Sequence, residues 1–330
     1  MIRVAVVGMG NIGNTHARCY RQNSKCIVSA VCDVVKERAD KAGQEFQCRA
    51  FYNVQDMIVA GGIDAASVAT AGYENGGDHY DPTMHLLRAG IPVLGEKPIS
   101  NDLGRASEMV GYANERRIAY AINLNHRFTP SARRAKEWLD SGRCGELNMI
   151  NMTLWINNPN ESSAHFHIRA LHPHSLDVMR YFGGGVEKVH AFFKKGAGRT
   201  IWSNVQINLL FANGVLGHLV GSYDGGGPGH QWGLEECQLI GQSGRIIIGN
   251  ACETLCFQAR NGIETEQFHH LGGMKTFAET FQSRIDAWIS DLINHTAPNE
   301  IDGKARDALD AQRIIEAAIE SWENDTVINV

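Results

Sequence analysis

Short apolar runs alternate with amphipathic segments through the first third of the chain. The apolar runs cover residues 2–7, 28–32, 64–70, 92–94 and 119–124. Strands that are buried on both faces are apolar at nearly every position, whereas strands with one wet face alternate. Because helical segments separate these runs, the pattern predicts β-α-β units over residues 1–124, in a parallel sheet with helices on both faces.

The pattern changes after Asn125. Thr129 and Pro130 suit the start of a helix running to about Asp140, with a threonine N-cap and proline at the first helical position. Alternating segments and turn signals then predict strands, interrupted by one helix at roughly 173–182. The strands are expected at 147–156, 186–193, 202–211, 215–222 and 234–240. Residues 125–330 should therefore form an α+β domain with a large, mostly antiparallel open sheet.

The last long amphipathic segment runs from about residue 303 to 323. Its apolar positions, among them Ala311, Ile315 and Ala318, recur at helical spacing on one face. That face must be buried against another element, and we expect this helix to pack back on the first domain.

The composition limits the number of domains and the kinds of partner that this chain can have. The chain has 330 residues, 43% of them hydrophobic, which is enough for two cores, and its net charge of -5 is spread without a basic stripe. Nucleic acid is therefore not an expected partner. The N-terminus enters an apolar strand directly and no apolar run approaches bilayer length, which predicts a cytoplasmic protein with no membrane partner. The eight scattered cysteines are expected to be reduced thiols.

A glycine-rich motif follows the first strand. Gly8, Gly10 and Gly13, with Asn11 and Ile12 between them, form a G-x-G-x-x-G sequence that opens into a helix. One glycine permits the tight turn, one lets the backbone approach a pyrophosphate, and one allows close helix–strand packing, while the helix N-terminus attracts the phosphates. The motif predicts a dinucleotide site.

Asp33 ends the second strand and favours NAD over NADP. A carboxylate there accepts hydrogen bonds from ribose hydroxyls and repels a 2′-phosphate. The cations Lys36 and Arg38 nearby leave NADP as the alternative cofactor. The competing interpretation is a glycine turn that serves only the fold, with Asp33 capping a strand end.

Lys97 lies in a Glu96-Lys97-Pro98 sequence that closes a predicted strand. Ligands of open α/β sheets bind beyond the carboxyl ends of the strands, and Pro98 holds Lys97 in an extended kink. Lys97 is thus a candidate for chemistry, although an isolated lysine after a strand is more often a solvated surface residue.

Four motifs in order carry a family resemblance. The glycine motif, Glu96-Lys97-Pro98, the sequence Asn-His-Arg-Phe at 125–128 and the sequence His-Ser-Leu-Asp at 174–177 follow one another along the chain. Over nearly its whole length the chain resembles the Gfo/Idh/MocA oxidoreductases, particularly their sugar and inositol dehydrogenases. His79 also occupies a position where that family places a histidine.

The resemblance implies an NAD-binding domain followed by an α+β domain whose open sheet often forms the subunit interface, hence a homodimer or homotetramer. It implies hydride transfer between nicotinamide and a secondary alcohol or ketone of a sugar, inositol or related polyol. Lys97 would bond the reacting oxygen, and His174 would relay the proton. Loss of the hydroxyl proton must accompany hydride removal, so a base and a cation at that oxygen both lower the barrier. We expect the two groups to meet over the nicotinamide.

The expected site residues follow from these motifs and the resemblance. Asp177 either orients His174 or packs structurally, and His126 and Arg127 either contact ligands or support the domain junction. The expected catalytic residues are Lys97, His174 and Asp177. The expected cofactor contacts are Gly8, Gly10, Asn11, Ile12, Gly13, Asp33, Thr70, His79, Glu96, Lys97 and Arg127. The expected substrate contacts are His126, Trp155, Asn157, His165, His167, Arg169 and His172.

Two departures from the family pattern stand out. Many relatives carry Asp where this chain has Ala170, so either a neighbour among His165, His167, Arg169 and His172 takes over that role, or the substrate differs from simple polyols. The segment 71–78 is about four residues longer than usual and is expected to shape the pocket. The histidines also suggest a metal centre, but no acidic or thiolate ligand accompanies them at metal spacing, so no metal is expected.

Two other functions stay open at this point. Some relatives are NAD-dependent glycoside hydrolases that oxidise a sugar transiently and then return the hydride. Others use the dinucleotide only for regulation and catalyse nothing. The presence of both Lys97 and His174 argues against the non-catalytic alternative.

Overall fold

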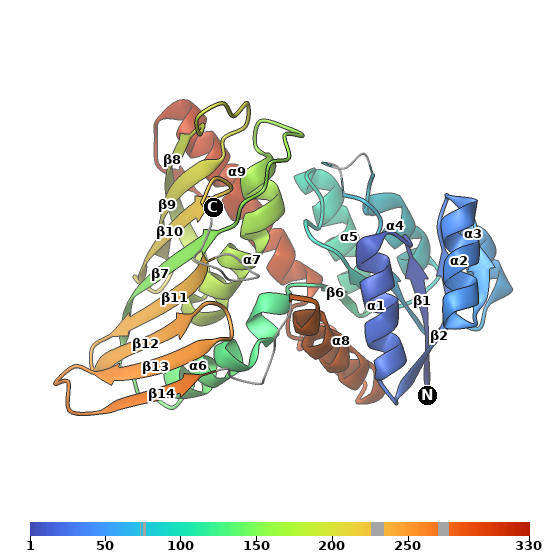
Figure 1. The fold of residues 1–330 in the computed structure, drawn as a ribbon, viewed down its shortest axis with the longest axis horizontal. Helices are drawn as coiled ribbons and strands as arrows, with labels where there is room; N and C mark the ends of the chain where they lie inside the picture. The colour runs from blue at the N-terminus through green and yellow to red at the C-terminus, as the bar shows by residue number, and fades with distance from the viewer. Residues whose placement is uncertain (73, 75–76, 226–233, 270–276) are drawn as a thin grey trace. The chain divides into compact units, whose positions relative to one another are not determined.

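The chain forms two compact units in a computed structural model that describes residues 1–72, 74, 77–225, 234–269 and 277–330. The first unit comprises residues 1–123 and 281–310 (Figure 1). The second unit comprises residues 124–280 and 311–330. The first unit is therefore built from two separate stretches of sequence.

A six-stranded parallel sheet forms the centre of the first unit. Its order is β3-β2-β1-β4-β5-β6, the arrangement of a Rossmann fold. The strands are β1 (Ile2–Val7), β2 (Cys26–Cys32), β3 (Arg49–Phe51), β4 (Ala65–Val68), β5 (Val93–Gly95) and β6 (Tyr120–Ile122). Five of them were predicted from apolar runs. The connections after β1 and β4 diverge at the point where the strand order reverses, which creates the crevice where such sheets bind dinucleotides.

Helices cover both faces of this sheet. They are α1 (Asn11–Gln22), α2 (Lys36–Phe46), α3 (Val54–Ala60), α4 (Tyr80–Arg88), α5 (Leu103–Glu115) and most of α8 (Phe277–Ile293). Phe281, Ile285 and Trp288 of α8 are buried in one core cluster with Val4 and Leu94 of the strands. A helix from late in the sequence thus completes the core of the N-terminal unit.

A nine-stranded mixed sheet forms the second unit, with the order β14-β13-β12-β11-β7-β10-β9-β8-β15. Strands β7 and β10 pair in parallel, and the other neighbours are antiparallel. The strands are β7 (Leu147–Trp155), β8 (Val186–Lys194), β9 (Asn204–Phe211), β10 (Leu216–Ser222), β11 (Leu234–Gly241), β12 (Gly244–Gly249), β13 (Thr254–Ala259), β14 (Thr265–His269) and β15 (Ile328–Asn329).

One long helix of the second unit differs from the prediction. The 3-10 turn η2 (Asn125–Phe128) and α6 (Pro130–Asp140) lie where expected, but α7 spans Phe166–Gly183, with Pro173 inside it. The expected helix start at Pro173 is therefore wrong. An internal proline removes one backbone hydrogen bond and strains the preceding turn, usually by about 3 kcal/mol. Burial of apolar side chains on both sides of Pro173 offsets that cost.

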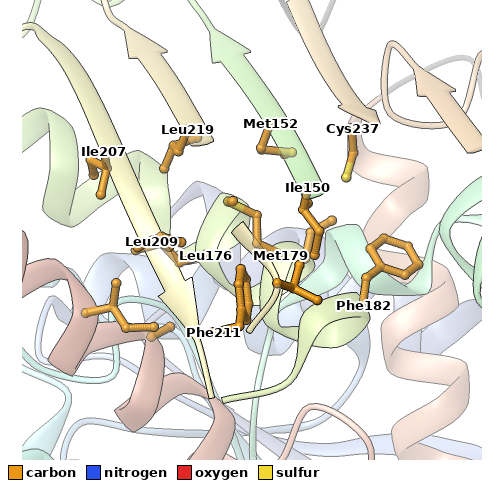
Figure 2. Close-up of a cluster of buried hydrophobic side chains, with 14 of the residues drawn as sticks. Ile150, Met152, Leu176, Met179, Phe182, Ile207, Leu209, Phe211, Leu219 and Cys237 are labelled. Carbon is orange, nitrogen blue, oxygen red and sulfur yellow. The ribbon is translucent and has the colours of Figure 1, made fainter. Parts of the chain in front are cut away.

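The core of the second unit lies between α7 and one face of the sheet. Figure 2 shows Leu176, Met179 and Phe182 of α7 facing the inward side chains of the strands. The labelled strand residues are Ile150, Met152, Ile207, Leu209, Phe211, Leu219 and Cys237. Along β7 the burial alternates, so its remaining positions lie on the other face of the sheet.

Helix α9 (Ala305–Asn324) corrects a second expectation. We expected the last helix to pack on the first domain, but its residues from Ala311 onward belong to the second unit. Ala311, Ile315 and Ala318 are buried in the same cluster as α7 and the sheet. The apolar stripe is a buried face, as expected; its part from Ala311 onward packs in the second unit, whereas residues 305–310 belong to the first unit.

Candidate active site

The glycine turn of the first unit leaves room for a pyrophosphate. A Cβ on Gly8 would collide with the backbone at Thr70, and one on Gly13 would collide with the Gly8 carbonyl. Gly10, in contrast, has nothing within 4 Å of its ideal Cβ position. Gly10 is also the N-cap of α1, whose first turn, including Asn11 and Ile12, has no side-chain cap and no acidic residue. A helix N-terminus without a side-chain cap, next to open space at Gly10, is what a dinucleotide phosphate requires, so these residues fit NAD.

Asp33 fixes the turn from the end of β2. Its Oδ2 accepts a hydrogen bond from the Met9 N–H at 2.6 Å, and its Oδ1 accepts one from the Val35 N–H at 2.8 Å. Each carboxylate oxygen keeps a further lone pair. Asp33 therefore supports the glycine turn and retains the acceptors that a ribose hydroxyl would need.

His79 joins the two segments that follow β4 and β5. Its Nδ1 lies 2.8 Å from the Pro98 carbonyl oxygen, and its Nε2 lies 3.0 Å from the Thr70 carbonyl oxygen. These contacts hold Thr70 and the Lys97 segment at one edge of the sheet. In the longer connection, Glu74 accepts a hydrogen bond from Asn101 at 3.0 Å, while residues 73 and 75–76 lie outside the described residues.

Glu96 lies in a buried polar network. Its Oε1 bonds His16 Nε2 at 2.9 Å and accepts from Asn123 Nδ2 at 2.6 Å, and His16 Nδ1 bonds Ser67 at 3.0 Å. Burial opposes ionisation of Glu96, but His16, Lys97 and Asn123 outweigh it and hold the pKa of the carboxyl below its usual range. Sequence reasoning missed His16 and Asn123, although a histidine on the apolar face of α1 was a usable signal.

Lys97 supplies a cationic group at this edge. Its side chain is half-buried, and its peptide bond to Pro98 is cis. Desolvation lowers the pKa of the ammonium, and the neighbouring Glu96 carboxylate partly restores it. A lysine with a lowered pKa exchanges its proton more readily near neutrality than a solvated one.

In the second unit, Arg127 and Asp177 form a buried ion pair. The Arg127 guanidinium donates from Nε to Asp177 Oδ2 at 2.7 Å and from Nη2 to Oδ1. A two-bond geometry of this kind is strong and directional. This ion pair holds η2 against α7, which is one of the two roles that the sequence left open for Asp177. A direct role of Asp177 in catalysis stays a prediction.

His174 lies one turn before Asp177 and stacks on His126. The two rings have centroids 4.1 Å apart and planes 19° from parallel. His126 Nδ1 lies 2.7 Å from Glu235 Oε1, and all three side chains are buried. Glu235 was not among the predicted site residues, since nothing local in β11 marks it.

His165 and Arg169 contact α9. Arg169 donates to both carboxylate oxygens of Glu316 at 3.0 and 2.7 Å, and His165 Nε2 lies 3.3 Å from Glu323. Both side chains are therefore engaged in helix packing, and their expected contact with substrate stays untested. Ala170 packs against a small apolar cluster of Leu154, Phe166, Leu171, Ile201 and Tyr223.

Trp155 and Asn157 lie at the end of β7. Trp155 is half-buried beside Gly225, and Asn157 is exposed. Their expected role in binding substrate stays a prediction.

His167 and His172 form a buried imidazole pair. Their Nε2 atoms are 3.0 Å apart, and His172 Nδ1 bonds Ser175 at 3.0 Å. Gly221 on β10 makes room for them, since a Cβ there would collide with the His172 ring. Burial lowers the pKa of His167 to about 3 and holds that of His172 well below its usual range. Both rings are neutral at physiological pH, and their expected contact with substrate stays a prediction.

This pair predicts an acid-sensitive stability. An unfolded histidine gains a proton below a pKa of about 6.5, whereas folded His167 resists protonation until about 3. Protonation thus favours the unfolded chain, and stability falls as the pH drops through this interval. For His167 alone the loss between pH 8 and pH 5 is about 2 kcal/mol.

We therefore expect His167→Gln to be less stable than wild type at pH 8, yet to lose about 2 kcal/mol less on going to pH 5. Urea titrations at the two pH values measure this. His269→Gln, which removes an exposed histidine on β14, is the matched control and should behave as wild type. Equal pH sensitivity in wild type and His167→Gln would contradict the assignment.

The described part of the chain holds neither a metal-ligand cluster nor a membrane-spanning helix. Outside residues 73, 75–76, 226–233 and 270–276, no three His, Cys, Asp or Glu side chains are grouped so that they could hold a metal ion. The helices within the same residues are all too short or too polar to cross a membrane. All eight cysteines are free thiols.

The Rossmann sheet, the open glycine turn and the lysine at its edge define the first unit as the nucleotide-binding part of an oxidoreductase. Family comparison gives the particular group. Residues 2–124 match the model of the oxidoreductase family with an NAD-binding Rossmann fold, and residues 132–247 match the C-terminal domain model of the same Gfo/Idh/MocA family. The chain belongs to the Gfo/Idh/MocA family of oxidoreductases, and its nucleotide-binding unit is of the NAD-binding type.

Individual relatives agree along the whole length. The rhizopine catabolism protein MocA of Rhizobium meliloti is 24% identical over 337 residues, which cover 98% of this chain and 96% of that protein. An Agrobacterium radiobacter oxidoreductase, solved with NAD+, L-tartaric acid and magnesium, superposes with a TM-score of 0.88 at 20% identity, covering 99% of this chain and 98% of that one. Levoglucosan dehydrogenase, solved with NADH and L-sorbose, gives 0.86 at 16% identity, covering 100% and 98%.

Proposed function

We propose that this protein is an NAD-dependent dehydrogenase or reductase that acts on a secondary alcohol or ketone of a sugar, inositol or related polyol. One observation carries the proposal: Lys97, with its lowered pKa, lies at the same edge of the first unit's sheet as the open glycine turn. A desolvated lysine beside a nicotinamide site is suited to polarising an alcohol or carbonyl oxygen by hydrogen bonding.

The chain's own residues have distinct roles in this proposal. Gly8, Gly10 and Gly13 hold the pyrophosphate, and Asp33 accepts from the ribose. NAD, when bound, accepts hydride from the carbinol carbon or donates it to the carbonyl. The Lys97 ammonium donates a hydrogen bond to the reacting oxygen and stabilises its negative charge.

His174 supplies the second proton-transfer group. In the oxidative direction, its imidazole takes up the proton that leaves the alcohol; in the reductive direction, it returns that proton. Histidine suits both directions, because its ordinary pKa lies close to neutrality.

The substrate class is proposed from relatives and from this chemistry together. Levoglucosan dehydrogenase was solved with L-sorbose, and the Agrobacterium protein with L-tartaric acid; both compounds carry two or more hydroxyl groups. A polyhydroxylated substrate also offers the neighbouring hydroxyls that buried polar side chains can hold by hydrogen bonds.

We also propose that two or four copies assemble through the open face of the second unit's sheet. Met149, Phe192 and Leu216 on strands of this sheet are 43%, 48% and 51% exposed. Met149 and Leu216 are direct neighbours in the pairing of β7 with β10. Adjacent exposed apolar side chains of this size favour burial against another surface.

The test of the activity is turnover with a panel of polyols and sugars plus NAD+, followed at the absorbance band of reduced nicotinamide. We expect NADH to accumulate in proportion to oxidised product with at least one panel member. NAD+ should give a higher kcat/KM than NADP+, because Asp33 opposes a 2′-phosphate.

The alternatives give different results in the same assay. Release of sugar from a glycoside without net change in NADH would indicate a glycoside hydrolase that recycles its cofactor. Tight NAD binding without turnover of any compound would indicate a regulatory protein. A higher kcat/KM with NADP+ would contradict the role assigned to Asp33.

A further inference from the structure

The carboxylate of Glu235 is buried in the second unit, on a strand with no other predicted site residue. Its side chain is 6% exposed, and it lies 109 residues from His126 in sequence, yet its Oε1 is 2.7 Å from the His126 Nδ1. Burying a carboxylate is costly unless a partner compensates it, and apolar residues of similar size would often serve stability equally well. A buried acid–imidazole pair therefore calls for an explanation beyond stability.

The His126 ring has a second neighbour, His174. The His126 ring, held by Glu235 at one edge, lies flat against the His174 ring with the centroids 4.1 Å apart. Both rings are almost fully buried, at 7% and 4% exposure. A ring in face-to-face contact restricts the plane that its neighbour can adopt.

The next residue strengthens the same arrangement. Arg127, directly after His126, binds Asp177, three positions after His174, through two hydrogen bonds. Two consecutive residues of η2 thus contact two positions on one side of α7, one by stacking and one by an ion pair. The stacked ring cannot slide along the helix while the ion pair is in place.

The contact with Glu235 also decides which ring nitrogen of His126 carries hydrogen. A carboxylate accepts but does not donate, so Nδ1 must be the donor. The hydrogen on Nδ1 then fixes the tautomer and the ring orientation, as carboxylates do for histidines that bind metals.

We propose that Glu235 and His126 form a positioning pair for His174: Glu235 fixes the His126 ring, and that ring fixes the plane of the proposed acid–base imidazole. This inference rests on the proposed function, because it assigns His174 to proton transfer. Neither Glu235 nor His126 touches the reacting atoms in this proposal.

The test compares Glu235→Gln with wild type in steady-state turnover of the best polyol. The amide is nearly isosteric, but it can present its NH2 group to His126 and no longer imposes the donor on Nδ1. We expect kcat to fall about 10-fold to 100-fold, the scale of losses caused by small misplacement of a reacting group. KM should stay within about twofold, and the solvent deuterium isotope effect on kcat should rise, since proton transfer becomes slower.

Glu236→Gln is the matched control. Glu236 is the next residue on β11 and is half-buried on the opposite face of the strand. It should leave kcat, KM and the isotope effect unchanged. An equal loss in both variants would show a general disturbance of β11 and would overturn the proposal.

A background lacking His174 separates positioning from a merely structural role. In His174→Asn, adding Glu235→Gln should cause no further loss of kcat, because there is no imidazole left to position. An additional 10-fold loss in that background would overturn the inference. If His174→Asn alone turns over as wild type, the proposed function of His174 fails first, and the two failures are thereby distinguished.

His126→Phe gives an independent route if Glu235→Gln does not fold. Phenylalanine keeps the stacked ring but removes the bond to Glu235. We expect His126→Phe to lower kcat when His174 is present. Added to His174→Asn, it should leave kcat unchanged. Unchanged kcat in the folded His126→Phe protein would contradict the proposal as directly as unchanged kcat in Glu235→Gln.

Discussion

Lys97→Met should lower kcat by about 10²-fold to 10⁴-fold, the usual contribution of an acid–base group, while leaving NAD affinity within a few-fold of wild type. The thioether keeps the length of the side chain but removes both the charge and the proton. Steady-state kinetics with the best polyol, together with calorimetric titration of NAD+, measure the two quantities separately.

The control is Lys41→Met, which removes an exposed lysine on α2 of the same unit. It should leave both quantities unchanged. Unchanged turnover in Lys97→Met would remove this lysine from the mechanism. A parallel loss of NAD affinity would assign it to cofactor binding instead.

His174→Asn should also lower kcat by about 10²-fold to 10⁴-fold. Asparagine retains a polar side chain of similar reach but cannot exchange a proton near neutrality. If Lys97 and His174 serve the same proton transfer, the double variant should lose little more than the worse single variant, because groups that act as a unit are not additive.

The competing outcome is a double variant whose loss equals the product of the two single losses. That result would mean that the two residues act in independent steps. His190→Asn, a change of a half-buried histidine on β8, controls for the loss of an imidazole elsewhere in the second unit.

The sequence predicts the fold best where the physical signal is local. The strand Ile2–Val7 and the helix Pro130–Asp140 have the bounds expected from the apolar run and from the threonine–proline start. Strand β3 has three residues, too few for a periodic pattern. The start of α7 was missed because proline locally favours the first turn of a helix. Only tertiary packing allows Pro173 to lie inside α7.

The candidate site likewise contains some residues that local motifs reveal and others that only the fold brings together. The glycine turn and Asp33 form a local motif, so both could be named from spacing alone. Glu235 could not, because its partner lies 109 residues away and only the sheet brings them together. His165, His167 and His172 could not be assigned to a face of a helix, because the helix was expected to begin after them.

The position of Ala170 illustrates what packing adds. The sequence left two possibilities for the carboxylate that many relatives carry there: a neighbouring residue takes over its role, or the substrate differs from simple polyols. The structure surrounds Ala170 with apolar side chains and shows contacts of His165, Arg169, His167 and His172 with other residues, and the choice between the two possibilities stays a prediction. The buried carboxylate linked to His174 comes from β11, through His126.

The first unit is encoded in two pieces, and this matters for anyone who wishes to produce it alone. A fragment that stops after β6 would lack Trp288 and Ile285, which fill the core beside Val4. Its uncovered apolar surface would favour association over folding. An independent nucleotide-binding module would need residues 281–310 joined to residue 123 by a short linker, a rearrangement of the gene and not a simple truncation.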